Sequence, residues 1–187
     1  MSTHDDLRDI ALNEFAVAGY AGTSLQRIAE LAGLSKSSVL YHFASKEALL
    51  EAAIGPAIDR MAAILDSLDG AITDDAARQA FIEQFVDFLL EHRLEVHMFI
   101  NQGPGLEDVP VIDRANGLVE NLATFFSSAT ATAEDHLRFG IALGGAAYVL
   151  SAKQDTSIEP PVDEIRAALI TILSELLAKV SVQQVTT

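Results

Sequence analysis

Apolar residues recur at every third or fourth position along most of this chain, and this spacing is typical of one face of an α-helix. No useful length of the chain alternates apolar and polar residues as a strand would, and there is no internal repeat. The first apolar stripe ends before Gly19, a residue that commonly follows a helix, and comprises Leu7, Ile10, Ala11, Phe15 and Ala18. The pattern therefore predicts an all-α protein of about nine helices.

Two of the expected helices are short and follow one another closely. Thr23 and Gln26 stand at the spacing of a capping box, with Thr23 as the N-cap and Gln26 reaching back. Gly33 is placed to end this helix in the left-handed conformation, and Ser35 is placed to cap the next one. Ala29 is small enough to let the two helices cross closely. The segment therefore has the form of a helix-turn-helix.

The helices expected further along are longer. The fourth begins at Ser45 and contains Gly55–Pro56, where the proline removes a backbone hydrogen bond and a kink is expected. Thr132 and Pro160–Pro161 mark the starts of the last two helices, and Gln102–Leu106 is the clearest interior break. The longer helices are predicted over residues 45–68, 74–92, 94–101, 110–127, 133–153 and 162–180.

The start of the third helix, which is the second of the two short ones, is rich in hydrogen-bond donors. Ser35, Lys36, Ser37 and Ser38 supply three hydroxyls, one ammonium group and free backbone N–H groups. These groups suit phosphates and base edges in a DNA major groove. Helical hairpins are also common in all-α proteins. Spacing alone therefore leaves two interpretations open, a helix-turn-helix that reads DNA or an ordinary hairpin.

Composition at first argues against a nucleic-acid partner. The 187 residues include 27 acids and 12 bases, which gives a net charge of −15. This charge is uneven, because the first 50 residues sum to −2 and the remaining 137 to −13. The acidic excess therefore belongs to the larger, later part of the chain, and a charge asymmetry of this kind indicates parts with different roles.

Other features of composition exclude several classes of protein. Half of the residues are apolar, which is enough for a sizeable core, and the absence of cysteine excludes disulfides, thiolate metal sites and cysteine nucleophiles. The polar, acidic start is unlike a signal peptide, and no uncharged run approaches the ~20 residues of a membrane-spanning helix. We therefore expect a soluble, cytoplasmic protein with no membrane partner.

The segment from Phe15 to Leu50 resembles a known family. It contains the turn Gly33-Leu-Ser-Lys36 and the run Tyr41-His-Phe-Ala-Ser-Lys-Glu-Ala-Leu49. Over about residues 5–50, the chain is similar to the N-terminal domain of the TetR (tetracycline-repressor-like) family of transcriptional regulators. The resemblance implies an N-terminal three-helix DNA-binding domain with the helix-turn-helix over residues 1–46. It also implies a larger helical domain for ligand binding and dimerisation over residues 47–187.

The resemblance further implies a sequence-specific DNA-binding regulator. A repressor that a small-molecule effector releases from a palindromic operator is the habit of the family, and the effector is unknown. Lys36, Ser37 and Ser38 would lie nearest the bases, and Tyr41 and His42 against the DNA backbone. The buried side of the module would be formed by Ile28, Ala29, Val39 and Phe43. The implied DNA-binding residues are Thr23, Ser24, Gln26, Ser35, Lys36, Ser37, Ser38, Tyr41, His42 and Lys46.

Two positions depart from the family pattern. Leu40 stands where the family usually has an aromatic residue, and Gln26 stands where it often has an arginine. Both changes predict modest and strongly salt-dependent affinity for each half-site, and hence reliance on dimerisation. The alternative is a dimeric helical module for interaction or ligand sensing whose DNA binding is weak or lost.

The last two helices are candidates for a homodimer interface. The helix over residues 133–153 carries Gly140, Gly144 and Gly145, which would let a partner backbone approach closely. Packing of the same faces within one chain is the other interpretation. A two-fold dimer would place two reading helices about one DNA turn apart, so a palindromic operator is expected.

The helices between supply candidate residues for a ligand pocket, although an ordinary aromatic core explains each of them as well. His92 and His97 are five residues apart, whereas a two-histidine metal site on a helix uses a spacing of four, so we expect no metal. We also expect no cofactor, and no motif of an enzyme is present. The candidate pocket residues are Phe81, Phe85, Phe88, His92, Met98, Phe99, Phe125 and Tyr148.

Overall fold

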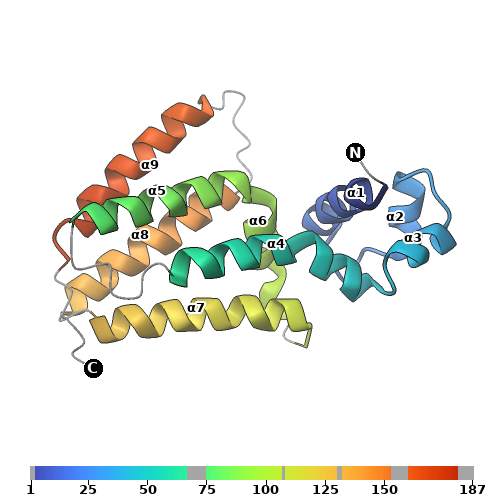
Figure 1. The fold of residues 1–187 in the computed structure, drawn as a ribbon, viewed down its shortest axis with the longest axis horizontal. Coiled ribbons are helices and arrows are strands. Elements are labelled where there is room, and N and C mark those ends of the chain that lie inside the picture. The colour runs from blue at the N-terminus through green and yellow to red at the C-terminus, as the bar shows by residue number, and fades with distance from the viewer. Residues whose placement is uncertain (1–2, 67–74, 107, 130–131, 153–159, 181–187) are drawn as a thin grey trace. The chain divides into compact units, whose positions relative to one another are not determined.

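The computed structural model describes residues 3–66, 75–106, 108–129, 132–152 and 160–180, and these residues form nine α-helices and no strand (Figure 1). The predicted all-α architecture is confirmed. None of the helices in the described ranges combines the length and the apolar composition that a membrane crossing requires. In chain order the elements are α1 Thr3–Ala18, α2 Leu25–Leu31, α3 Lys36–His42, α4 Lys46–Asp66, α5 Asp75–Glu91, α6 Arg93–Gln102, the 3-10 turn η1 Gly103–Gly105, α7 Pro110–Ala129, α8 Ala133–Ser151 and α9 Val162–Leu177.

The last helix is shorter than predicted. It was expected to reach Val180 but ends at Leu177, because the N–H of Val180 donates to the carbonyl of Leu177 at 3.1 Å and closes a tighter turn. The predicted helix ends at Leu68, Asp74 and Lys153 lie outside the described residues. Helix α4 continues through Pro56, and the kink expected there stays a prediction.

Local signals fix the short N-terminal helices. Gly19 and Gly33 adopt positive φ angles of 84° and 67°, as expected for residues that follow helices. Ser35 caps α3 by accepting from the N–H of Ser38 at 3.1 Å, and Ser45 caps α4 by accepting from the N–H of Ala48. The predicted termini therefore form where the residues with the required side chains or backbone freedom stand.

The capping box predicted for α2 is wrong. The cap is Ser24, whose backbone is extended and whose hydroxyl accepts from the N–H of Arg27 at 3.1 Å. The hydroxyl of Thr23 donates instead to the carbonyl of Gly19 at 2.7 Å, so it is committed to the preceding turn. Gln26 does not reach back, because its amide donates to the Glu30 carboxylate at 3.0 Å.

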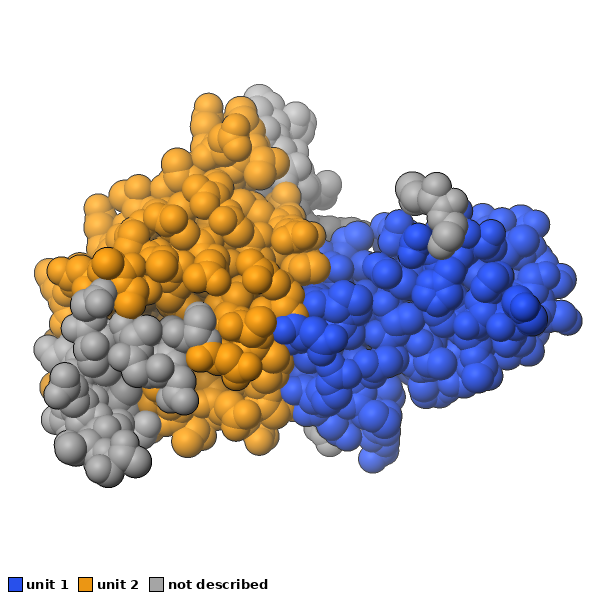
Figure 2. Space-filling view, in the orientation of Figure 1, with its two compact units in different colours: residues 1–59, 94–115 blue, residues 60–93, 116–187 orange. Residues whose placement is uncertain are grey.

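The described helices form two compact units (Figure 2). The first comprises residues 1–59 and 94–115 and so combines α1 to α3 with the first part of α4, most of α6 and the start of α7. The second comprises residues 60–93 and 116–187. The domain boundary after residue 46, implied by the family resemblance, stays a prediction.

The first unit has an aliphatic and aromatic core to which each of its helices contributes. Arg114 of α7 also donates to Glu51 at 2.6 Å and to Asp59 at 2.5 Å, two carboxylates of α4 on either side of Pro56. The fully buried side chains of this core include Leu7, Phe15, Ile28, Leu49, Leu50, Met98 and Ile112.

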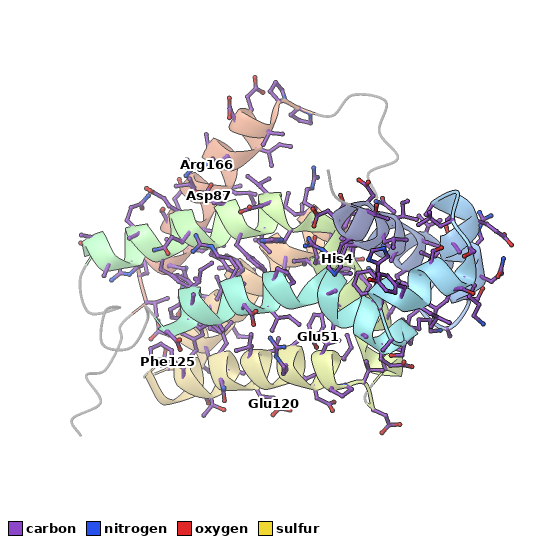
Figure 3. The ribbon with its side chains drawn as sticks, turned by 45° about the vertical axis from the view of Figure 1, so that its right-hand side comes forward. His4, Glu51, Asp87, Glu120, Phe125 and Arg166 are labelled. Atoms are coloured by element: carbon purple, nitrogen blue, oxygen red, sulfur yellow. The ribbon has the colours of Figure 1, made fainter. Side chains whose placement is uncertain are left out.

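The second unit is built around α5, α8 and α9. Arg166 of α9 donates to both carboxylate oxygens of Asp87 on α5, at 2.5 and 2.9 Å, and Figure 3 shows the two side chains facing one another. The Arg166 guanidinium holds the pKa of Asp87 below its usual value. The core of this unit is formed by Ile64, Phe81, Ile82, Phe85, Leu89, Phe126, Phe139, Leu173 and Leu177.

Candidate nucleic-acid interface

The turn between α2 and α3 has the hydrogen bonds of a Schellman motif. The N–H of Gly33 donates to the carbonyl of Glu30 at 3.1 Å, and the N–H of Leu34 donates to the carbonyl of Ala29 at 2.8 Å. These two bonds satisfy two carbonyls of the last turn of α2 and require the positive φ angle of Gly33. The turn therefore sets the direction in which α3 leaves α2.

One side of this helix-turn-helix is completely buried. Ile28, Ala29 and Val39 have no exposed surface, and Phe43 is almost as deeply buried. The interpretation of these four residues as core is confirmed. Because their burial holds α2 and α3 by one face only, the opposite face of α3 is left to solvent.

The exposed face of α3 carries most of the predicted contact residues. Lys36 and Ser37 are exposed, and the ring of Tyr41 is 87% exposed, more than any other large apolar or aromatic side chain in the described ranges. Ser35 and Ser38 are tied to each other, with 2.8 Å between their hydroxyl oxygens. The first turn of α3 therefore presents one ammonium and one hydroxyl beside a pair of serines engaged in the cap.

Leu40 lies on the same exposed part of α3. Its side chain is 42% exposed, so it is a surface residue and not part of the core. Tyr41, the next residue, meets the ring of His42 edge-on with 5.4 Å between centroids. The aromatic surface of α3 is therefore supplied by Tyr41 and His42, which follow the position where the family usually has its aromatic residue.

A further histidine, which the sequence analysis did not single out, lies beside this surface. The ring of His4, labelled in Figure 3, packs on Phe43 with 4.5 Å between centroids and lies 6.4 Å from the ring of His42. Nothing in the local sequence pattern links positions 4 and 42. Their proximity depends on the packing of α1 against the end of α3.

Lys46, one of the implied DNA-binding residues, is engaged by groups of the protein itself. Its Nζ donates to the carbonyls of Tyr20 at 2.9 Å and Thr23 at 3.1 Å, and it lies 4.1 Å from the centroid of the Tyr20 ring. Burial of Tyr20, with the carboxylate of Glu47 nearby, raises the pKa of the phenol to about 12. The ring therefore stays neutral beneath the ammonium. Two of the three hydrogens of Lys46 are used to hold the chain between α1 and α2.

The start of α2 combines one buried and two exposed predicted contacts. Thr23 is only 2% exposed, whereas Ser24 and Gln26 are exposed. The acids nearby are engaged, since Glu30 accepts from Gln26 and Glu14 pairs with Arg27 at 3.2 Å. The ten predicted DNA contacts thus lie on α2 and α3, directly before them, or at the start of α4, all in one compact unit. Their contact with DNA stays a prediction.

The predicted pocket residues divide between the two units. Met98 and Phe99 belong to the first unit, and the other six belong to the second. Tyr148 differs from the rest, because its ring is 65% exposed on α8. No group of three metal-binding side chains gathers among the residues that the structure describes. The assignment of these residues to a ligand pocket stays a prediction.

The aromatic residues of the second unit pack mainly with one another. Phe81 stacks with Phe85 at 5.9 Å between centroids, and Phe88 lies 5.1 Å from the ring of His92. Phe126, which stacks on Phe139 at 3.8 Å, is fully part of this packing. The unit therefore has an aromatic interior that includes three of the candidate residues, Phe81, Phe85 and Phe88.

The N-terminal part of the chain matches a family model. Residues 7–53 fit the model described as bacterial regulatory proteins, tetR family. The transcriptional regulator RutR of Escherichia coli K12 is 42% identical over 81 residues, which are 43% of this chain and 36% of RutR. The transcriptional repressor KstR2 of Mycolicibacterium smegmatis is 29% identical over 117 residues, 60% of this chain and 55% of KstR2. The chain thus matches about a third to a half of the length of these relatives.

Solved structures extend the likeness of fold to almost the whole chain. The ketosteroid transcriptional regulator KstR2 of Mycobacterium tuberculosis superposes with a TM-score of 0.73 at 16% identity, covering 96% of this chain and 95% of KstR2. A TetR-family member from Streptomyces coelicolor A3, SCO3833, gives a TM-score of 0.67 at 22% identity, covering 89% and 88%. Residues 7–53, which contain the helix-turn-helix, therefore match the TetR family of bacterial regulatory proteins, and the likeness of fold extends over almost the whole chain.

Proposed function

We propose that this chain is a sequence-specific DNA-binding transcriptional regulator that acts in the cytoplasm. The observation that carries the proposal is the polar, exposed face of α3, with Lys36, Ser37 and Tyr41, on a helix whose other face is buried. A helix held in this way can enter a major groove and offer donors to bases and phosphates. The nearby Glu14 is paired with Arg27, so it opposes the phosphates less than a free carboxylate would.

A substitution of Lys36 tests this proposal. The operator is first selected from random double-stranded DNA with the wild-type protein, and affinity is then measured by fluorescence anisotropy over a range of salt concentrations. Lys36→Ala is expected to weaken binding about tenfold and to lower the slope of log affinity against log salt by about 1, since one phosphate or base contact is lost. Lys179→Ala, an exposed lysine beyond α9, is the control with the same change of charge.

The same experiment distinguishes the alternative function. A helical module for interaction or ligand sensing that has lost DNA binding would select no operator. Equal affinity of Lys36→Ala and the wild type would remove α3 from the interface. Repression, with release from the operator by a small-molecule effector, belongs to the proposal on the strength of the family, and its readout is a fall in operator affinity when the effector is added.

We further propose that the protein is a homodimer joined through α8 and α9. Leu137, Ile141 and Tyr148 recur along α8 at helical spacing and are all more than half exposed. Gly144 lies on the same stripe, and an added Cβ at this position would meet nothing within 4 Å. An apolar stripe with a glycine at its centre suits the close approach of a second copy. Two copies would present two α3 helices to a palindromic operator.

A further inference from the structure

One side chain from α6 bonds to two backbone groups at the end of α1. The amide oxygen of Gln102, its Oε1, accepts from the N–H of Tyr20 at 2.6 Å. The amide nitrogen, its Nε2, donates to the carbonyl of Phe15 at 2.6 Å. Gln102 is partly buried and is separated from these partners by 82 and 87 positions in the sequence. The two bonds join two distant stretches of chain within the first compact unit.

The break between α1 and α2 explains why an amide is suited to this place. Helix α1 ends at Ala18, and Gly19 turns the backbone with a φ angle of 84°. Beyond such an end, the N–H of Tyr20 needs a partner outside the helix, whereas the carbonyl of Phe15 already accepts from the N–H of Gly19 at 3.1 Å and takes the Gln102 amide as a second donor. The side chain of Gln102 carries one acceptor and one donor on the same planar group, so it meets a donor and an acceptor together.

Tyr20, one of the two residues that Gln102 holds, is also held by Lys46. Lys46 donates to the carbonyls of Tyr20 and Thr23 and lies over the Tyr20 ring, while the hydroxyl of Thr23 donates to Gly19. Gln102 and Lys46 therefore meet at Tyr20 from two sides, Gln102 at its N–H and Lys46 at its carbonyl and ring. Ser24, the cap of α2, follows Thr23 directly.

We propose that Gln102 is a positioning residue for DNA recognition. Residues 15–23, which lead from the end of α1 to α2, form a corner of the chain, and through Gln102 helix α6 holds this corner in place for the helix-turn-helix. Gln102 touches no DNA in this role, and the inference rests on the proposed function. Its two bonds keep the corner in one conformation, and the corner fixes where α2 starts and where Lys46 lies. When these bonds are lost, the fraction of molecules whose helix-turn-helix is competent to bind DNA falls, and the apparent affinity for DNA falls by the same factor.

The test compares two variants of Gln102 with a neighbour. Gln102→Met has a similar length and can make neither bond, and Gln102→Glu keeps an acceptor for Tyr20 but loses the donor to Phe15. Asn101→Ala is the control, because Asn101 is exposed and its amide bonds only within its own helix, to His97. Each full-length protein is titrated with the operator selected by the wild type, well below its melting temperature, and hydrogen exchange of the Tyr20 amide is followed by NMR.

The expected result is a loss of affinity without a loss of phosphate contacts. Gln102→Met should bind the operator about tenfold more weakly with the same salt slope as the wild type, and Gln102→Glu should be affected less. The Tyr20 amide should exchange faster in Gln102→Met, and Asn101→Ala should match the wild type in both measurements. If the slope of log affinity against log salt is lower for Gln102→Met than for the wild type, Gln102 itself contributes to the phosphate contacts, and the proposal is overturned.

The outcome separates the two proposals. If the wild type binds an operator and Gln102→Met binds it equally well, Gln102 has only a structural role, even if the melting temperature falls. If Gln102→Met has lost its fold, the same comparison is made with Gln102→Glu, whose equal affinity and unchanged Tyr20 exchange would likewise overturn the inference. If the wild type selects no operator, the proposed function is wrong, and the role of Gln102 in DNA recognition is wrong with it.

Discussion

The helix-turn-helix and helix α8 expose opposite kinds of surface. Helix α3 presents Lys36, Ser37 and Tyr41 to solvent, whereas α8 presents Leu137 and Ile141. A polar, donor-rich surface suits a charged and hydrated partner, and an apolar stripe suits a dry contact with another protein surface. The comparison also explains why a net charge of −15 is compatible with DNA binding, because the first 50 residues sum to only −2.

The largest effect is expected when a charge is placed on the exposed apolar stripe of α8. Ile141→Asp places a carboxylate within the exposed stripe of α8, and an unpaired charge in a dimer interface is strongly unfavourable. We expect the variant to be a monomer at micromolar concentration. Its operator affinity should be lowered by about 100-fold or more, because a monomer binds with a single helix-turn-helix. Sedimentation velocity and anisotropy measure the two effects.

His136→Asp is the control for this substitution, since His136 is exposed on α8 away from the stripe of Leu137, Ile141 and Tyr148. It should remain a dimer. A wild-type protein that sediments as a monomer, or an Ile141→Asp variant that remains a dimer, would show that the apolar stripe has another role.

The second prediction compares two lysines of the helix-turn-helix unit. Lys36 is exposed, whereas Lys46 holds two carbonyls and lies over the Tyr20 ring. Lys46→Met should lower the free energy of unfolding by about 2 kcal/mol, because charge-assisted hydrogen bonds and the cation–π contact are lost together. Lys36→Ala should change it by less than about 0.5 kcal/mol. Urea unfolding measures both, and equal effects of the two substitutions would contradict the structural role of Lys46.

The helix-turn-helix could be predicted because its determinants are local. Gly33 and Ser35 stand within a few residues of the groups they satisfy, so the sequence pattern indicates both the turn and the next cap. The choice between Thr23 and Ser24 as the cap of α2 was not available from the pattern, since both hydroxyls fit. It is decided by the carbonyl of Gly19, which accepts the hydroxyl of Thr23.

The positions of Gln102 and Lys46 could not be predicted in the same way. Their partners lie between 23 and 87 positions away, and no periodicity links an amide in α6 with the end of α1. Tyr148 illustrates a different limit. Its place on a helical apolar stripe indicates a surface to be covered, but the pattern does not distinguish a ligand pocket from an exposed face, and in this structure the ring is exposed.

The third prediction uses two glycines that differ in backbone conformation. An added Cβ meets nothing within 4 Å at either Gly33 or Gly144, but only Gly33 has a positive φ angle. Gly33→Ala should therefore destabilise the protein by about 1–2 kcal/mol. Gly144→Ala lies within a helix and should stabilise a monomer by up to about 1 kcal/mol.

Of these two glycine substitutions, Gly144→Ala also tests the proposed dimer. If a second copy approaches Gly144 closely, Gly144→Ala should weaken dimerisation although it favours the helix. Thermal unfolding at several protein concentrations separates the two effects, because only the dimer contribution depends on concentration. A gain in stability that is the same at every concentration would place Gly144 outside the interface.

The smallest expected effect concerns the ion pair between α5 and α9, which holds one helix of the proposed dimer surface. Arg166 lowers the pKa of Asp87, so the folded protein binds a proton there less readily than the unfolded chain. The stabilising contribution is therefore present at neutral pH and is lost as the pH falls below the ordinary range of an aspartate. Because both side chains are partly exposed, Asp87→Asn should lower the melting temperature at pH 7 by at most about 3 °C, and the difference from the wild type should shrink towards pH 3. Asp75→Asn makes the same chemical change at an exposed ion pair with Arg78 that lies within α5, so it is the control for losing a pair that joins no second helix. A difference for Asp87→Asn that persists at pH 3 would show that Asp87 acts through packing and not through its charge.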